Sequence, residues 1–148
     1  MENNSSHICK PSIEVAAAAI FRDGLILITT RPVGSYMEGL WELPGGKREK
    51  NESLEQCLER EIIEEIGISV KIKHSLKNVK YEYESFFISL TIFVCSCVCG
   101  NPRGLQGQKL LWVKPEDLVK YRFPPADMEV IPFLADIKNQ DNLKFSIL

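Results

Sequence analysis

The sequence predicts an α/β fold, an α/β/α sandwich in which helices cover both faces of a mixed β-sheet. Two observations lead to this prediction. Strand-like apolar segments lie before and after one amphipathic helix, in residues 13–30 and 68–113. A further helical pattern follows near residue 130. Strands on both sides of a central helix, with another helix at the end, favour layers of helix, sheet and helix.

The first expected element is a β-hairpin. Residues 13–22 and 25–31 form two apolar runs, and Asp23-Gly24 between them is a pair that favours a tight two-residue turn. The following residues, 32–51, are rich in glycine and proline, which is typical of a loop.

A central helix is expected over residues 53–67. Ser53, with Gln56 three positions later, matches the capping box that begins many helices. Apolar side chains recur every four residues and predict one buried stripe, formed by Leu54, Leu58, Ile62 and Ile66. Gly67 then suits the C-terminal cap.

The second half of the chain is expected to form mainly strands. They cover residues 68–76, 79–85, 86–98 and 109–113, and the third is long enough to be central. The turn-rich residues 101–108 form a loop before the last strand. A short helix beginning at Pro115 and a final helix over residues 124–139 complete the pattern.

Length and composition indicate one globular domain. We expect residues 12–140 to form it, after a disordered lead-in of residues 1–11, because 148 residues can bury a substantial core.

A net charge of -2 argues against a nucleic-acid polymer as partner. The chain shows no signal peptide and no apolar stretch long enough to span a bilayer, so no membrane partner is expected. Five cysteines, an odd number, fit a reducing compartment. We expect a cytoplasmic protein that is a monomer or a weak homodimer.

The last turns of the central helix carry Glu61, Glu64 and Glu65. On a helix these residues lie within an arc of about 100° beside the apolar stripe, and their charges repel one another. A solvated charged face is the ordinary explanation, but such a face usually mixes signs. The basic neighbour, Arg60, is expected to point away from the three carboxylates. A bound Mg²⁺ or Mn²⁺ would relieve the repulsion, because hard cations prefer oxygen ligands.

The residues around these glutamates match a sequence pattern of fixed spacing. The chain matches in full the pattern G-x5-E-x7-R-E-U-x-E-E-x-G-U, where U is a bulky aliphatic residue, through Gly46, Glu52, Arg60, Glu61, Ile62, Glu64, Glu65, Gly67 and Ile68. This segment resembles the signature of the Nudix hydrolases. The resemblance implies a Nudix-type sandwich that holds divalent metal against the diphosphate of a nucleotide-like substrate.

The similarity extends over about residues 13–135 and resembles the MutT branch, notably in GLWELPGGK, GNPRGLQGQKLLWVKPEDL and YRFPPADMEVIPFL. It implies Mg²⁺-dependent hydrolysis of 8-oxo-dGTP and related oxidised nucleotides to the monophosphate and pyrophosphate, which limits mutation. The alternatives are a pyrophosphohydrolase of CTP, dCTP or mixed nucleoside triphosphates, and a base-reading Nudix module without hydrolysis.

The resemblance also implies roles at the metal site. The implied ligands are Glu61, Glu64, Glu65 and the backbone carbonyl of Gly45. Glu61 would in addition position or deprotonate the attacking water, although all three glutamates stay open as the base. Arg60 would orient the carboxylates by ion pairing, and Glu52 would support the same network from the start of the helix.

On the substrate side, the resemblance places Arg31 against the phosphates. The expected wall of the nucleotide pocket is Glu42, Leu43, Pro44 and Gly45. Tyr36 and Tyr83 are expected to flank the base, whereas Trp41 is expected in the core.

Asp127 matches the position at which MutT-type enzymes read the base, where Asn is the common residue. An ionised carboxylate only accepts hydrogen bonds, whereas an amide also donates. Asp127 can accept from N7–H of 8-oxoguanine or from an amino group such as cytosine N4, and Asp is also a favoured helix N-cap. The identity of the base therefore stays open. A second departure is Gln106, where relatives commonly have Glu.

Overall fold

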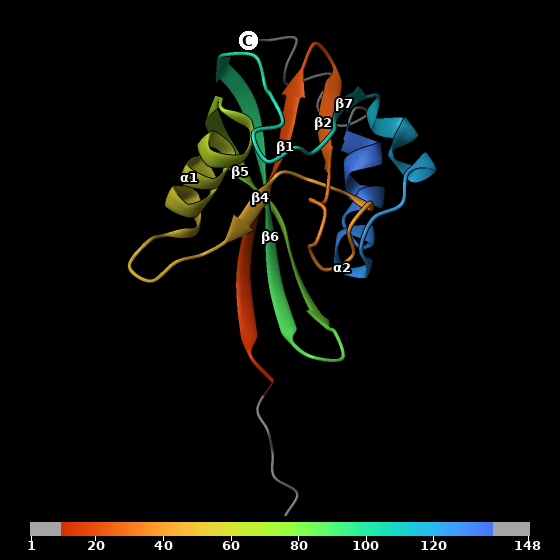
Figure 1. The fold of residues 1–148 in the computed structure, drawn as a ribbon. Coiled ribbons are helices and arrows are strands. Elements are labelled where there is room, and N and C mark those ends of the chain that lie inside the picture. Colours follow the sequence, from red (N-terminus) through yellow and green to blue (C-terminus); the bar gives the residue numbers. More distant parts are fainter. Residues whose placement is uncertain (1–9, 138–148) are drawn as a thin grey trace, which may run out of the picture.

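The computed structural model describes residues 10–137, which form a mixed β-sheet with helices on both faces (Figure 1). The strands are β1 (Ser12–Arg22), β2 (Leu25–Thr30), β3 (Trp41–Glu42), β4 (Gly45–Lys47), β5 (Ser69–Glu82), β6 (Phe87–Cys99) and β7 (Leu110–Val113). The helices are α1 (Leu54–Ile66), the 3₁₀ helix η1 (Pro115–Lys120) and α2 (Pro125–Met128). The predicted α/β/α sandwich is confirmed. Residues 1–9 of the predicted lead-in lie outside the described residues.

Strands β1 and β6 form the centre of the sheet and run parallel, from Ser12 opposite Phe87 to Phe21 opposite Ser96. The strand order is β3-β2-β1-β6-β5, while β4 pairs with β1 and β7 pairs with β2. These other pairings are antiparallel. A parallel pair needs a crossover connection. Here the chain between β1 and β6 passes through α1, which packs against β1, β4 and β5.

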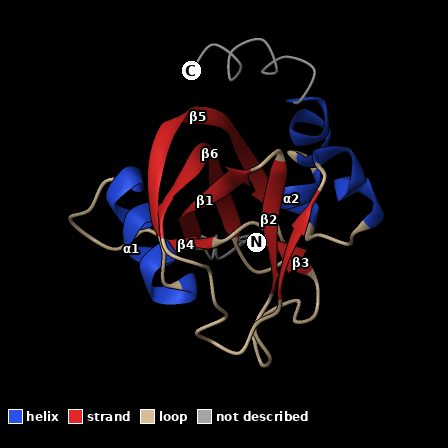
Figure 2. Ribbon diagram, turned by 90° about the horizontal axis from the view of Figure 1, so that it is seen from above, coloured by secondary structure: helices blue, strands red, loops and turns tan. Residues whose placement is uncertain are grey.

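The alanine run in β1 divides the core into two layers. Ala16 and Ala18 pack with Leu58 of α1, whereas Ala17 and Ala19 belong to the cluster on the α2 side. Side chains alternate between the two faces of a strand, which explains this division. Figure 2 shows the sheet between α1 on one side and α2 on the other. Residues of the same central strand therefore belong to the core on both faces of the sheet.

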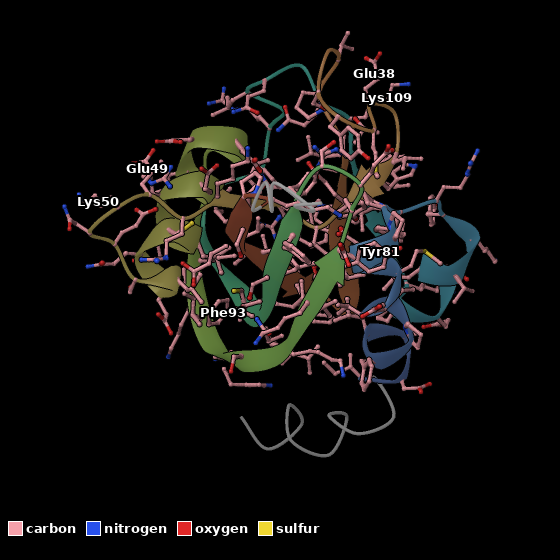
Figure 3. All side chains as sticks on the ribbon, turned by 90° about the horizontal axis from the view of Figure 1, so that it is seen from below. Glu38, Glu49, Lys50, Tyr81, Phe93 and Lys109 are labelled. Carbon is pink, nitrogen blue, oxygen red and sulfur yellow. The ribbon has the colours of Figure 1, made fainter. Side chains whose placement is uncertain are left out.

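Helix α1 begins and ends as predicted. The Ser53 hydroxyl accepts a hydrogen bond from Gln56 N, and the Gln56 side chain accepts one from Ser53 N. Gly67 is left-handed with φ 70°, and its N–H donates to the last turn of the helix. In the loop before α1, Glu49 and Lys50 project outward from the molecule (Figure 3).

The predicted hairpin is also confirmed. Strands β1 and β2 pair with Arg22 opposite Leu25, so the turn contains only Asp23 and Gly24. Both turn residues have positive φ, 52° and 76°, as a two-residue turn of this kind requires.

Two strands predicted over residues 68–76 and 79–85 are a single strand, β5, and this prediction was wrong. Strand β5 pairs with β6 along its whole length, with irregular register near His74 and Ser75. The segment contains no glycine or proline, so β-bulges absorb the mismatch without ending the strand.

The final helix predicted over residues 124–139 is divided. Helix α2 ends at Met128, residues 129–130 form a turn, and the chain is helical again over residues 131–137. Pro132 explains the division, because it lacks an N–H and its ring would clash with the Met128 carbonyl in a continuous helix. Residues 138–139 lie outside the described part of the chain. Within residues 10–137, no helix is both long and apolar enough to cross a membrane.

The loop predicted over residues 32–51 contains two short strands. Strand β3 pairs with β2, and β4 pairs with β1. Strand β4 also contacts α1. The sheet thereby fixes the backbone of Gly45 and Gly46 beside the acidic helix.

Candidate active site

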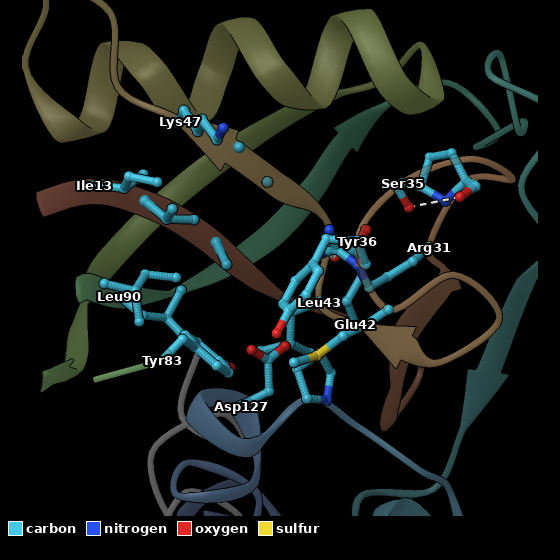
Figure 4. Close-up of a pocket in the computed structure, with 18 of the residues that line it drawn as sticks. Ile13, Arg31, Ser35, Tyr36, Glu42, Leu43, Lys47, Tyr83, Leu90 and Asp127 are labelled. Carbon is cyan, nitrogen blue, oxygen red and sulfur yellow. Dashed lines mark hydrogen bonds and ion pairs between the residues drawn. The ribbon is translucent and has the colours of Figure 1, made fainter. Parts of the chain in front are cut away.

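A cavity of about 450 Å³ lies between the sheet, the end of α1 and the start of α2 (Figure 4). Eight of the predicted site residues line it: Arg31, Tyr36, Glu42, Leu43, Gly45, Glu65, Tyr83 and Asp127. Strands β1 and β6 add an apolar wall that includes Val15 and Leu90. The cavity therefore combines an apolar wall with carboxylates from three separate segments.

Pro44 is the exception in the predicted wall. It is buried, it does not line the cavity, and its carbonyl accepts a hydrogen bond from Ala18 N at 2.8 Å. The prediction was wrong for this residue, because Pro44 attaches the segment to β1 while its neighbours Leu43 and Gly45 face the cavity.

Arg60 joins the acidic residues of α1. Its guanidinium donates to Glu61 Oε1 at 2.8 Å and to Glu64 Oε2 at 3.2 Å. It also donates to both carboxylate oxygens of Glu52, at 2.7 and 3.0 Å. The expectation that Arg60 points away from the carboxylates is therefore wrong. Arg60 reaches Glu64 because residues four positions apart lie on the same face of a helix. Its side chain is also long enough to reach Glu52 in the loop before α1.

The contact between Arg60 and Glu52 fixes their charges. Hydrogen bonds from Arg60 lower the pKa of Glu52 to about 2, with help from the Glu49 N–H, and Glu52 in turn raises the pKa of Arg60. Burial raises the pKa of Glu61, while Arg60 lowers it. Arg60 therefore forms an ion pair with Glu52 and a second ion pair with Glu61.

Glu65 faces the cavity. Its Oε2 accepts a hydrogen bond from Gly45 N at 3.2 Å. Burial, together with the charges of Glu42 and Glu61, raises the pKa of Glu65 to about 8. Ionised Glu65 is consequently unfavourable without a neighbouring cation, which a divalent metal would supply.

Two glycines bring the loop backbone close to these carboxylates. A Cβ on Gly46 would lie 2.3 Å from Glu61 Cδ, and a Cβ on Gly45 would lie 2.1 Å from the Ala16 carbonyl oxygen. No side chain fits at either position without displacing its neighbours. The glycine that begins the signature, Gly46, and its neighbour Gly45 thus have a steric reason in this structure.

The chemistry of the donors fits a divalent metal. Within residues 10–137, no three acidic, histidine or cysteine side chains hold a metal geometry in their present conformations. Glu61 and Glu64 face Arg60, whereas Glu65 faces Gly45. Three carboxylates and a nearby carbonyl are the hard oxygen ligands that Mg²⁺ prefers.

Asp127 lies in the first turn of α2 and points into the cavity (Figure 4). Pro124 occupies the N-cap position and no side chain caps α2, so the N-cap interpretation of Asp127 is wrong. Burial, with a smaller contribution from the charge of Glu42, raises the pKa of Asp127 from 3.8 to about 7 against the opposing effects of Arg31 and the Leu43 N–H. The acid and carboxylate forms are therefore both populated at neutral pH.

Tyr83 directly follows β5 and contacts the helix that carries Asp127. Its hydroxyl accepts a hydrogen bond from Ala126 N at 3.1 Å. Its ring meets Tyr36 edge to face, with centroids 6.1 Å apart. A flat base does not fit between two rings in this contact. The predicted flanking role of the two tyrosines therefore requires Tyr36 to move.

Arg31 lines the cavity and is paired with Glu42 and the Tyr36 backbone. Its Nη1 lies 2.6 Å from Glu42 Oε2, and its Nε donates to the Tyr36 carbonyl at 2.5 Å. Burial raises the pKa of Glu42, and Arg31 opposes this rise. Arg31 thus balances the charge of Glu42, and its contact with phosphates stays a prediction. Trp41 is partly buried against the core and packs edge to face on Tyr121 outside the cavity lining.

Among the residues at the site that were not predicted, Phe86, Arg48 and Gln108 make specific contacts. Phe86 lines the cavity beside Tyr83, with ring centroids 4.9 Å apart, and its place in an aromatic segment was a usable signal. Arg48 pairs with Glu14 of β1 and holds the loop before α1. Gln108 bonds to the end of α1. No spacing in the sequence distinguishes the latter two.

Known proteins are similar to this chain in sequence and in fold. A family described as NUDIX domain matches residues 16–132. The chain is 38% identical to the CTP pyrophosphohydrolase of Escherichia coli (strain K12) over 119 residues, which cover 80% of this chain and 88% of that protein. It is 36% identical to the 8-oxo-dGTP diphosphatase of Haemophilus influenzae over 123 residues, covering 82% and 90%.

A solved structure agrees with these similarities. The crystal structure of the MutT protein from Methanosarcina mazei Go1 superposes with a TM-score of 0.77 at 27% identity, covering 89% of this chain and 98% of that one. The resemblance inferred from the signature is confirmed. Together with the mixed sheet and the acidic helix, these matches show that the chain belongs to the NUDIX domain family of hydrolases.

Proposed function

We propose that this chain is a Mg²⁺-dependent nucleoside triphosphate pyrophosphohydrolase whose preferred substrate is 8-oxo-dGTP. Its products are the nucleoside monophosphate and pyrophosphate, and its activity keeps oxidised nucleotides out of DNA. The acidic end of α1 supports the reaction class, and the cavity beside α2 supports the choice of base. A single domain over residues 12–140 carries both parts.

The proposed metal ligands are Glu61, Glu64, Glu65 and the carbonyl of Gly45. Bound Mg²⁺ supplies neutralisation of phosphate charge and a water molecule of lowered pKa. Arg60, held by Glu52, keeps the acidic face of α1 oriented toward the loop. Glu61 is proposed to position or deprotonate the attacking water, and Arg60 orients its carboxylate through the hydrogen bond at 2.8 Å.

The proposed choice of nucleobase depends on the protonation state of Asp127. With a pKa of about 7, Asp127 is the neutral acid in a large fraction of the molecules at neutral pH. A carboxylic acid both donates and accepts, as does the Asn that is common at this position in MutT-type enzymes. 8-oxoguanine presents the O6 acceptor next to the N7–H donor, and one carboxylic acid complements both. Guanine carries no hydrogen on N7 and would lose one of these bonds.

CTP or dCTP is the second candidate substrate. Cytosine presents an N4 amino donor beside the N3 acceptor, and Asp127 accepts from N4 in either protonation state. The similarity to the Escherichia coli CTP pyrophosphohydrolase supports this candidate.

Competing substrates separate the two candidates. We expect kcat/KM with Mg²⁺ at pH 7 to be roughly tenfold or more higher for 8-oxo-dGTP than for dGTP, because one lost hydrogen bond in a partly buried site costs about 1–3 kcal/mol. Equal values for these two nucleotides would contradict the proposed sanitising role. A higher kcat/KM for CTP or dCTP than for 8-oxo-dGTP would favour the second candidate.

A further inference from the structure

Helix α1 ends beneath a loop that returns to it. Arg103 N donates to the Ile66 carbonyl and Leu105 N donates to the Glu65 carbonyl, both at 3.0 Å. The last carbonyls of a helix have no partner within the helix itself. Residues 103–108 therefore complete the hydrogen bonding of α1 at the position of the proposed metal ligand Glu65.

Gln108 is the side chain that fastens this loop. It is 8% exposed, and both ends of its amide are used. Its Nε2 donates to the Glu65 carbonyl at 3.0 Å, and its Oε1 accepts from Gln106 N at 2.8 Å. The side chain of Gln106 itself is exposed. A buried amide with both functions paired sets one orientation of the backbone that it contacts.

The loop is closely packed and anchored at its far end. A Cβ on Gly104 would lie 2.0 Å from the Gln108 carbonyl oxygen. Lys109 N donates to Thr30 Oγ1 at 2.9 Å, and Thr30 N donates to the Lys109 carbonyl at 3.0 Å. Gln108 thus lies between a fixed point on β2 and the end of α1, so it cannot shift without moving one of them.

We propose that Gln108 is a positioning residue for Glu65. Its amide holds the Glu65 carbonyl, and through it the backbone from which the Glu65 carboxylate reaches the Gly45 N–H. This inference rests on the proposed metal role of Glu65. Side chains that orient a metal ligand in this way typically account for about 10–100-fold in metal affinity.

Mn²⁺ binding to the nucleotide-free protein tests the inference by isothermal titration calorimetry. Gln108→Leu removes both hydrogen bonds at similar volume, and Gln108→Glu removes the donor while it keeps the acceptor for Gln106 N. We expect about tenfold weaker Mn²⁺ binding for both variants. Asn101→Ala truncates an exposed amide in the same loop, and we expect wild-type affinity.

Thermal unfolding and amide exchange separate positioning from simple stability. We expect the Gln106 amide to exchange faster in Gln108→Leu than in Gln108→Glu, because only the first variant loses its acceptor. If Gln108→Leu does not fold, the Mn²⁺ affinity of Gln108→Glu alone tests the inference. Variants with a lower Tm but wild-type Mn²⁺ affinity would overturn the inference, since Gln108 would then only stabilise the loop. A wild-type protein that binds no Mn²⁺ would overturn the metal site itself, which is a distinguishable failure.

Discussion

Asp127→Asn changes how stability depends on pH. The substitution keeps the size of the side chain and its ability to donate and accept, and it removes only the titration. Because burial raises the pKa of Asp127 from 3.8 to about 7, the folded protein binds this proton more tightly than the unfolded chain does. The wild-type protein therefore loses stability as pH rises through this range, and the variant does not lose that part.

The size of the effect follows from the pKa difference. A rise from 3.8 to about 7 corresponds to about 4 kcal/mol in the free energy of unfolding. Part of it is already lost at pH 5, so the change between pH 5 and pH 8 is about 2.5 kcal/mol. Asp127 keeps partial contact with solvent, which makes this an upper value.

Urea unfolding of both proteins at pH 5 and pH 8 measures this effect. We expect the variant to gain about 1–2.5 kcal/mol relative to the wild type between the two pH values. Asp136→Asn makes the same chemical change at an exposed aspartate in the following helical segment and serves as the matched control. A constant difference for Asp127→Asn would refute the raised pKa, and with it the reading of 8-oxoguanine by a neutral acid.

Three substitutions test other parts of the site. Tyr83→Phe leaves the Ala126 N–H without its acceptor, so we expect a loss of about 1–2 kcal/mol in urea unfolding. The KM for 8-oxo-dGTP should also rise, and an unchanged KM would argue against support of α2 by Tyr83. Arg60→Ala frees the carboxylates of Glu61 and Glu64, so Tm should fall in EDTA and recover partly with Mg²⁺; equal losses in both buffers would count against a metal between them. Glu64→Gln should lower kcat by roughly 100-fold or more, because residues that only orient metal ligands already account for up to about 100-fold. Full activity of this variant would show that Glu64 is not a metal ligand.

Features set by neighbouring residues were predictable from the sequence. The Asp23-Gly24 turn, the capping box at Ser53 and the Gly67 cap each depend on residues within a few positions of one another. The division of the final helix was predictable on the same grounds, since Pro132 alone accounts for it.

Features set by distant contacts were not predictable. Strand β5 is continuous because β6 pairs with it throughout, and nothing between residues 76 and 79 indicates this. Arg60 turns toward the carboxylates because Glu52 lies across a loop from it. Sequence spacing describes a helix face, but it does not describe what a long side chain meets beyond that face.

At the candidate site, the identity of most residues was predictable and their state was not. The protonation of Asp127 depends on burial and on the charge of Glu42, 85 positions earlier in the chain. The contact between Tyr36 and Tyr83 likewise depends on two loops meeting over the cavity. Gln108 became recognisable only once its amide was seen against the end of α1.

Phosphorus NMR of the reaction products shows whether α1 carries a metal-dependent pyrophosphohydrolase. The protein is incubated with 8-oxo-dGTP in the presence of Mg²⁺, and in a parallel sample with EDTA. We predict that the Mg²⁺ sample yields 8-oxo-dGMP and pyrophosphate, and that the EDTA sample yields no products. Release of orthophosphate with the nucleoside diphosphate, or hydrolysis that persists in EDTA, would contradict this prediction.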